Sequence, residues 1–199
     1  AGPERSVAAT KSYLCSLAAL LQLAAHWSQD ARLLAALDHL PALLDEAFAQ
    51  DWSSLAEGLA DGRNLFVLGR GPGLGAAQEI ALKLKETCGI HAEAFSSAEV
   101  RHGPMTLVGP GFPLLVLTQD DASHPGSVDA AREFAARGAR VWTAGADAGT
   151  ALPGRRDAHP LLAPLLAVSS FYRAVNALAL ARGRDPDQPP HLNKVTETV

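Results

Sequence analysis

Three charged side chains stand at helical spacing within residues 75–87, which are predicted to form a helix. Glu79, Lys83 and Glu86 occupy positions i, i+4 and i+7, so all three project from one face of that helix. Such a row is usually a solvated ladder of ion pairs. This helix, however, is expected to begin at the carboxyl end of a buried strand, where open α/β sheets bind ligands. A lysine between two carboxylates at that place can tune one of them as a general base.

A histidine and a lysine outside this helix are the other candidates for chemistry. His102 lies in residues 99–104, a polar stretch with glycine and proline that is expected to form a loop. A loop histidine titrates near neutral pH and can pass a proton, although a single histidine is more often incidental. Lys194 lies in the polar tail, residues 185–199. A tail lysine is normally only solvated, but one that folds over a site can condense with a sugar carbonyl as a Schiff base.

A glycine-rich run, residues 69–75, lies between a predicted strand and the predicted helix, where backbone N–H groups can meet an anionic ligand. Its glycines stand at every second position, and Pro72 removes one donor. No acidic residue ends a second strand about twenty residues later to contact a ribose, as a dinucleotide site requires. We therefore interpret the run as architectural, a turn that lets the helix approach the sheet, and expect no dinucleotide cofactor.

The remaining reactive side chains indicate no second type of site. His91 and Glu93 lack a third ligand at helical or hairpin spacing, so neither a metal nor a cofactor is expected. Cys15, Cys88 and the serine pair 169–170 have no partnered base nearby in the sequence, which gives nucleophilic hydrolysis no support. Two cysteines far apart favour a reducing compartment over a disulfide framework, and the cytoplasm is the expected location.

The composition fits one well-filled domain, or a domain with a helical appendage. The chain has 199 residues, of which 48% are hydrophobic, and a net charge of -4. Since lysine and arginine form no cluster, a nucleic-acid partner is not expected, and any anion must be held locally. Residues 13–25 are too short to cross a bilayer, and the apolar residues 161–180 contain Arg173 and Asn176, so no membrane association is expected.

The order of the predicted elements indicates an α/β fold. Buried or extended strands are predicted at residues 65–68, 91–95, 113–117 and 139–143. Helices are predicted at residues 75–87, 127–136 and 161–180, and within residues 6–61. Strands that alternate with helices imply a three-layer αβα sandwich with a doubly wound, mainly parallel sheet of the flavodoxin type, preceded by long helices.

Six short runs, spread over nearly the whole chain, stand in a distinctive order. They are residues 7–13, 66–72, 81–86, 90–95, 99–104 and 185–189, the last accompanied by Leu192 and Lys194. In order and spacing they resemble the SIS (sugar isomerase) family, as represented by the isomerase domain of glucosamine-6-phosphate synthase. By this resemblance, residues 1–60 would be a helical segment that closes a preceding SIS unit, residues 61–184 an SIS-type α/β domain, and residues 185–199 an active-site tail.

The resemblance implies a role for the helical charges. Glu86 would be the base that moves a proton between sugar C1 and C2, which is aldose–ketose isomerisation through an enediol-type intermediate. Lys83 would support the charge of Glu86. The backbone of Val7, Ala8 and Ala9 would lie against the sugar, although Ala9 stands where a serine is common in the family.

The resemblance also implies a substrate and a partner. His102 would serve ring opening and would reach the site of a neighbouring subunit, so a homodimer is expected. Lys194 would pair with the open-chain carbonyl. The expected substrate is a small-molecule sugar phosphate, a hexose or hexosamine 6-phosphate such as fructose or glucosamine 6-phosphate. The resemblance does not distinguish deamination, isomerisation and glutamine-dependent amino transfer as the reaction.

One part of the family's site has no counterpart in this sequence. The family holds phosphate in Ser/Thr-rich loops of its first SIS unit, whereas residues 117–121, Leu-Thr-Gln-Asp-Asp, are acidic and unsuited to phosphate. The chain is therefore expected to begin after that cradle. A non-catalytic phosphosugar-sensing module is the alternative reading, since SIS units also occur in regulators. Retention of Glu86, His102 and Lys194 favours an enzyme, because a sensor needs the phosphate loop more than a proton shuttle.

Overall fold

The sheet at the centre of the molecule is entirely parallel. A computed structural model describes residues 1–146 and 148–194. The strands are β1 (Asn64–Gly69), β2 (His91–Ser96), β3 (Pro113–Leu117), β4 (Arg140–Ala144) and β5 (Thr150–Leu152). They pair in the order β2-β1-β3-β4-β5, the doubly wound order of flavodoxin-like folds. The predicted α/β class and parallel sheet are confirmed.

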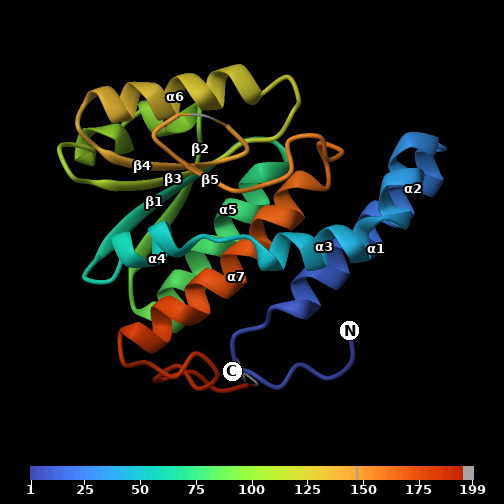
Figure 1. Ribbon diagram of the computed structural model, residues 1–199, viewed down its shortest axis with the longest axis horizontal. Helices are drawn as coiled ribbons and strands as arrows, with labels where there is room; N and C mark the ends of the chain where they lie inside the picture. Colours follow the sequence, from blue (N-terminus) through green and yellow to red (C-terminus); the bar gives the residue numbers. More distant parts are fainter. Residues whose placement is uncertain (147, 195–199) are drawn as a thin grey trace.

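Helices cover both faces of this sheet, so the molecule has three layers (Figure 1). The helices are α1 (Lys11–Ser28), α2 (Ala31–Asp38), α3 (Leu40–Ala49), α4 (Ser53–Gly58), α5 (Pro72–Lys83), α6 (His124–Ala136) and α7 (Ala163–Ala181). A π-helical turn, Leu84–Cys88, continues α5, and two 3-10 turns, Glu99–Arg101 and Pro104–Leu107, follow β2. α5 and α7 pack on one face of the sheet, and α6 packs on the other.

The side chains of the central strand alternate between two cores. Leu65 and Val67 of β1 belong to the core beneath α5 and α7, whereas Phe66 and Leu68 belong to the core beneath α6. All four are 4% exposed or less. A strand buried on both faces reads as a continuous apolar run, which is why β1 could be predicted from the sequence.

The turn between β1 and α5 holds the helix close to the strand. A Cβ atom on Gly69 would lie 2.2 Å from the carbonyl oxygen of Gly73, so only glycine fits there. Gly71 has a φ of 54°, in the region that favours glycine. The helix begins at Pro72, earlier than the predicted start at residue 75, because proline is pre-organised for the first turn of a helix.

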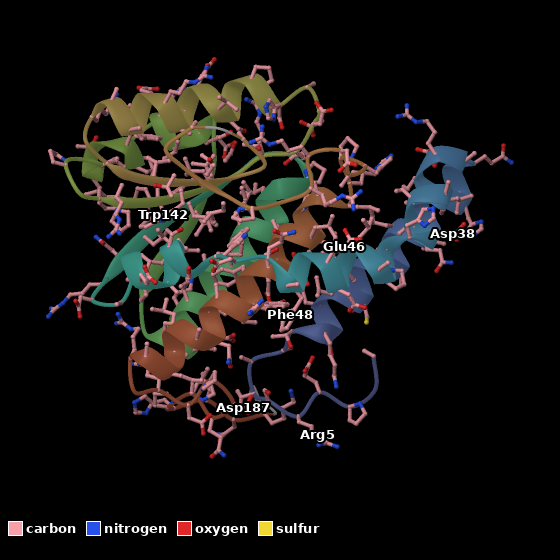
Figure 2. The ribbon with its side chains drawn as sticks, viewed as in Figure 1. Arg5, Asp38, Glu46, Phe48, Trp142 and Asp187 are labelled. Atoms are coloured by element: carbon pink, nitrogen blue, oxygen red, sulfur yellow. The ribbon has the colours of Figure 1, made fainter. Side chains whose placement is uncertain are left out.

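The leading helices share their packing with the α/β unit. Trp52, Leu55 and Leu59 are 2% exposed or less and lie in the same core as β1 and α7. α1 and α2 reach away from the sheet, and Figure 2 shows Asp38, at the end of α2, far from the buried Trp142 of β4. The division at residues 60 and 184 stays a prediction.

α7 is a core helix of this structure. It has the length and the apolar composition of a membrane-spanning helix, but 67% of its most apolar window is buried inside the molecule. Phe171 and Leu178 pack under the sheet, and Leu166 packs against the leading helices.

The fifth strand was not predicted. β5 has only three residues, and two of them are exposed. It pairs with β4 at the edge of the sheet, where an alternating or continuous apolar run is not required.

Candidate functional site

A buried lysine lies at the centre of the candidate site. Lys83 is 2% exposed, and its Nζ atom lies 3.2 Å from Glu79 Oε1 and 2.8 Å from Glu86 Oε2. The three residues therefore share one face, as their spacing predicted. A solvated ladder does not describe them, because Glu79 is only 7% exposed. Burial of a lysine between two carboxylates satisfies each charge and fixes the position of the more exposed one, Glu86.

Glu86 belongs to the π-helical turn that ends α5. Its side chain is 20% exposed, whereas that of Lys83 is 3% exposed. Thr87 donates a hydrogen bond from Oγ1 to the carbonyl oxygen of Lys83 at 2.8 Å. Short π-helical segments inside α-helices occur often at functional sites, because the extra residue re-aims the side chains of that turn. Here the turn presents one carboxylate to Lys83 and leaves that carboxylate accessible.

A tyrosine from α7 completes this polar cluster. Tyr172 donates a hydrogen bond from its hydroxyl to Glu79 Oε1 at 2.7 Å, and the backbone carbonyl of Thr10 lies 3.4 Å from the same hydroxyl. Burial, followed by the hydrogen bond and negative charge of Glu79, raises the pKa of Tyr172 far above its ordinary value. The hydroxyl is therefore a permanent donor. Sequence reasoning missed Tyr172; the one available signal was that a buried tyrosine hydroxyl usually has a partner.

The segment before α1 is held beside this cluster by its own contacts. Glu4 Oε2 accepts hydrogen bonds from the backbone N–H of Thr10 at 3.2 Å and of Ser12 at 3.0 Å, which caps α1. Burial opposes ionisation of Glu4, but the hydrogen bonds from Ser12 and Thr10 outweigh it and hold the pKa of Glu4 below its usual value. Ala8, which belongs to the same segment, is 3% exposed.

The C-terminal tail runs along this leading segment. The backbone N–H of Val7 donates to the carbonyl oxygen of Asp187 at 3.2 Å, and Ser6 donates from Oγ to Asp187 Oδ1. Lys194 donates from Nζ to the carbonyl oxygen of Ser6. Figure 2 shows Asp187 beside the segment that carries Arg5. The predicted tail lysine thus contacts Ser6, the residue that precedes the predicted substrate-binding residues 7–9.

An open pocket of about 400 Å³ is lined by residues of the charged cluster, the leading segment and the C-terminal tail. Its walls come from the leading segment, the α5 helix with its π-helical turn, α7 and the tail, represented by Ser6, Ala8, Lys83, Thr87, Tyr172, Asn176 and Asp187. Val7 and Ala9 flank the lining residue Ala8, and Glu86 is bound to the lining residue Lys83. A carboxylate held by a buried ammonium is suited to proton transfer on a carbonyl compound.

His102 does not join Glu86 within the chain. The loop around it anchors Val100 and Val108 in the core beneath α6, while Leu84 and Cys88, on either side of Glu86, belong to the core beneath α7. The His102 side chain is exposed. The structure thus places this histidine on the opposite layer of the sandwich, facing outwards.

The crevice at the glycine-rich turn is filled by the chain itself. Gln119 donates from Nε2 to the carbonyl oxygen of Arg70 at 2.8 Å and to Asp121 Oδ2 at 3.0 Å. Asp121 also accepts from the backbone N–H of Ser123 at 2.8 Å. Burial works against ionisation of Asp121, but the hydrogen bonds from Ser123 and Gln119 keep its pKa below the usual value. The Gln119 side chain therefore occupies the glycine-rich turn, with its amide beside Arg70 and Gly73.

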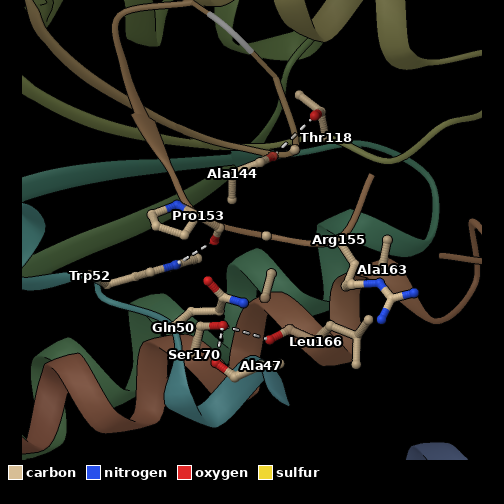
Figure 3. A pocket seen from close by; sticks show the side chains of 13 residues that line it. Ala47, Gln50, Trp52, Thr118, Ala144, Pro153, Arg155, Ala163, Leu166 and Ser170 are labelled. Carbon is tan, nitrogen blue, oxygen red and sulfur yellow. Dashed lines mark hydrogen bonds between the residues drawn. The ribbon is translucent and has the colours of Figure 1, made fainter. Parts of the chain in front are cut away.

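A second recess lies between α3, α7 and the segment that follows β5 (Figure 3). Trp52 donates from Nε1 to the carbonyl oxygen of Pro153 at 2.9 Å, and Ser170 donates from Oγ to that of Ala47 at 2.7 Å. Its volume of about 30 Å³ admits little more than water. Within residues 1–146 and 148–194, no three His, Cys, Asp or Glu side chains come together as a metal site would need.

Comparison with known proteins relates these features to a family. Residues 58–180 match the SIS domain family. The chain is 32% identical to glutamine–fructose-6-phosphate aminotransferase (isomerizing) of Zymomonas mobilis and 38% identical to that of Leifsonia xyli, and each alignment covers 98% of this chain and 35% of the relative. The chain thus spans about a third of the length of the curated relatives it matches.

Solved structures agree with this relationship. A Silicibacter pomeroyi protein assigned as a phosphosugar isomerase is 44% identical with a TM-score of 0.88, over 94% of this chain and 58% of that one. Glucosamine-6-phosphate deaminase of Thermotoga maritima is 26% identical with a TM-score of 0.75, over 96% of this chain and 58% of that one. Because the family match covers more than half of its residues, the chain belongs to the SIS domain family, as the resemblance of its motifs predicted.

Proposed function

We propose that this chain supplies the proton-transfer half of a phosphosugar isomerase site, which acts on a hexose or hexosamine 6-phosphate. The observation that carries the proposal is the pairing of Glu86 with Lys83, at 2.8 Å, because Lys83 lines an open pocket of about 400 Å³. Relatives with this domain support the substrate class, since their names include fructose 6-phosphate and glucosamine 6-phosphate. The reaction proposed is aldose–ketose isomerisation coupled to removal or transfer of the amino group.

Glu86 acts in this proposal as the base at the sugar carbons. Its carboxylate takes the proton from C1 or C2 of the open-chain sugar, the electron pair moves into an enediol or enolamine, and the same proton returns to the neighbouring carbon. Lys83 holds the Glu86 carboxylate in place by their ion pair at 2.8 Å. Lys194 pairs with the open-chain carbonyl, and the backbone of residues 7–9 positions the sugar.

The proposed site requires parts from outside this pocket. His102 is exposed on the other layer of the sandwich, so its proposed role in ring opening is exerted in the site of a neighbouring subunit of a homodimer. Phosphate is held by a unit outside these residues, because the acidic turn at Asp121 is occupied by its own hydrogen bonds. The cytoplasm is the proposed location.

The direct test is incubation of the full-length protein with glucosamine 6-phosphate or fructose 6-phosphate, with and without glutamine. Ammonia and the two sugar phosphates are assayed. Interconversion of the sugar phosphates is the expected result, and ammonia released without glutamine identifies a deaminase. Binding of either sugar phosphate without turnover would contradict the proposal and favour the sensing module.

A further inference from the structure

We propose that Tyr172 is a positioning residue for Glu86, acting through Glu79 and Lys83. This inference rests on the proposed function, in which Glu86 is the base. Tyr172 makes no hydrogen bond to Glu86; it holds the carboxylate that competes with Glu86 for the same ammonium. Its hydroxyl therefore sets how much of the Lys83 charge is directed at Glu86.

The geometry is a chain of three polar contacts. The Tyr172 hydroxyl lies 2.7 Å from Glu79 Oε1, the same Oε1 lies 3.2 Å from Lys83 Nζ, and Nζ lies 2.8 Å from Glu86 Oε2. Lys83 is thus closer to the outer carboxylate than to the inner one. Glu79 Oε1 accepts from both Tyr172 and Lys83, so the hydroxyl supplies part of the stabilisation that a buried carboxylate needs.

Removal of the hydroxyl leaves Glu79 with Lys83 as its remaining charged partner in the cluster. Because Glu79 is 7% exposed, water compensates poorly, and the buried carboxylate must draw Lys83 more strongly. Lys83 then moves towards Glu79 and holds the Glu86 side chain less firmly in place. The carboxylate that accepts the proton is then less well positioned, without any change to Glu86 itself.

The surroundings keep Tyr172 in this role. Its ring is 8% exposed and packs in the core beneath the sheet, so the side chain cannot swing into solvent. The charged and titratable groups that face its hydroxyl are Glu79 on α5, Tyr13 on α1 and Glu4 before α1, together with the carbonyl of Thr10. All of them oppose ionisation of the phenol, so it donates throughout the working pH range.

The test is Tyr172→Phe in the full-length protein, with sugar-phosphate interconversion as the assay. We expect kcat to fall by about tenfold, which corresponds to one hydrogen bond to a charged group, while KM stays nearly constant because the hydroxyl makes no contact with substrate. A KM increase with unchanged kcat would overturn the proposal.

Tyr13→Phe is the matched control. Tyr13 also loses a phenol hydroxyl near α5, but its hydroxyl donates to the carbonyl oxygen of Gly75 at 3.2 Å and not to the charged cluster. This variant should keep both kcat and KM. Equal effects of the two substitutions would indicate a general packing role and would refute the positioning role.

Two further measurements separate this inference from the proposed function. In a Glu79→Gln background, Tyr172→Phe should have little further effect on kcat, since its intermediary is already neutral; fully additive losses would contradict the proposal. If the wild-type protein shows no turnover, nuclear magnetic resonance spectroscopy of the charged cluster tests the role of Tyr172 instead. The Lys83 Nζ and Glu86 carboxyl resonances should move in Tyr172→Phe and stay in place in Tyr13→Phe, and unmoved resonances in both would refute the inference.

Discussion

The turn after β1 and the face of the helix that follows it are adjacent in sequence and opposite in character. The turn, within residues 69–75, has the glycine-rich composition of an anion site, yet Gln119 closes it by a 2.8 Å hydrogen bond to the carbonyl of Arg70. The helix face has no conspicuous motif, yet Lys83, at 2% exposure, is bound to two carboxylates beside an open pocket. The glycines thus serve contact between strand and helix, and the charged residues serve chemistry.

This difference shows what a glycine-rich turn can and cannot establish. A backbone that is free to approach a ligand is equally free to approach another part of its own chain. In this structure the second use prevails, because Gly69 packs against Gly73 and the Gln119 side chain lies against Gly73 and Arg70. The buried ammonium has no comparable structural explanation, since apolar residues usually stabilise a core as well or better.

The largest expected effect comes from Glu86→Gln, which tests the helix face directly. Loss of the base should lower turnover by about 10²- to 10⁴-fold, the usual contribution of general acid–base catalysis. Sugar-phosphate affinity, measured by calorimetry in the full-length protein, should change little. Glu93→Gln, an exposed glutamate on β2, is the control and should keep full turnover; undiminished turnover in Glu86→Gln removes Glu86 from the mechanism.

Lys83→Met should have the next largest effect, on the free energy of unfolding. The substitution leaves Glu79 buried without its counter-charge, and breaking a buried pair in this way costs about 3–5 kcal/mol. Urea denaturation measures the loss. Arg132→Met is the control, because the Arg132–Asp129 pair is 67% exposed on both sides and separated by 3.9 Å. Similar losses in the two variants would show that the Lys83 cluster is not specially dependent on its charge.

Gln119→Ala tests the opposite region. It removes the group that bridges Arg70 and Asp121, so the free energy of unfolding, measured by urea denaturation, should fall by about 1–3 kcal/mol. Turnover should stay nearly unchanged, because the glycine-rich turn has no part in the proposed proton transfer. A large loss of turnover at unchanged stability would reverse the contrast between the two regions.

The smallest expected effect concerns ionisation near the helix face. Burial, followed by the charge of Glu79, raises the pKa of Tyr13 to about 12. A phenol in solution ionises near pH 10, so Tyr13 binds its proton more tightly in the folded state. The stability that this contributes is present below about pH 10 and is lost as pH rises towards 12. The difference between the ultraviolet titrations of the wild-type protein and the Tyr13→Phe variant reports the ionisation of Tyr13. It should show essentially no phenolate at pH 10, and half-ionisation of Tyr13 at that pH in the folded protein would contradict its burial.

The fold could be predicted where burial leaves a local pattern. β1 and β3 are buried on both faces and appear in the sequence as continuous apolar runs. β5 leaves no such pattern, since two of its three residues are exposed and its pairing to β4 is a tertiary contact. The start of α5 was placed too late because Pro72 and Gly73 suggested a loop, whereas close packing on Gly69 requires them inside the helix.

The site could be predicted only as far as its spacing is local. Lys83 lies three or four residues from each of its carboxylate partners, so helical periodicity alone predicts that all three share one face. Tyr172 lies 93 positions from Glu79, and no periodicity connects them. The contact between Ser6 and Asp187 spans 181 positions and depends on how the tail folds back. Contacts between residues so far apart in the chain form only in the complete fold, so local sequence patterns do not predict them.

The π-helical turn at Leu84–Cys88 makes the site sensitive to chain length. A π-helical turn holds one residue more than an α-helical turn. Deleting a single residue between Lys83 and Glu86 would keep every reactive group, yet it would rotate Glu86 by about 100° around the helix axis, away from Lys83. Insertions and deletions within this segment are therefore more damaging to the geometry than most substitutions. The number of residues there is as much a part of the site as their identity.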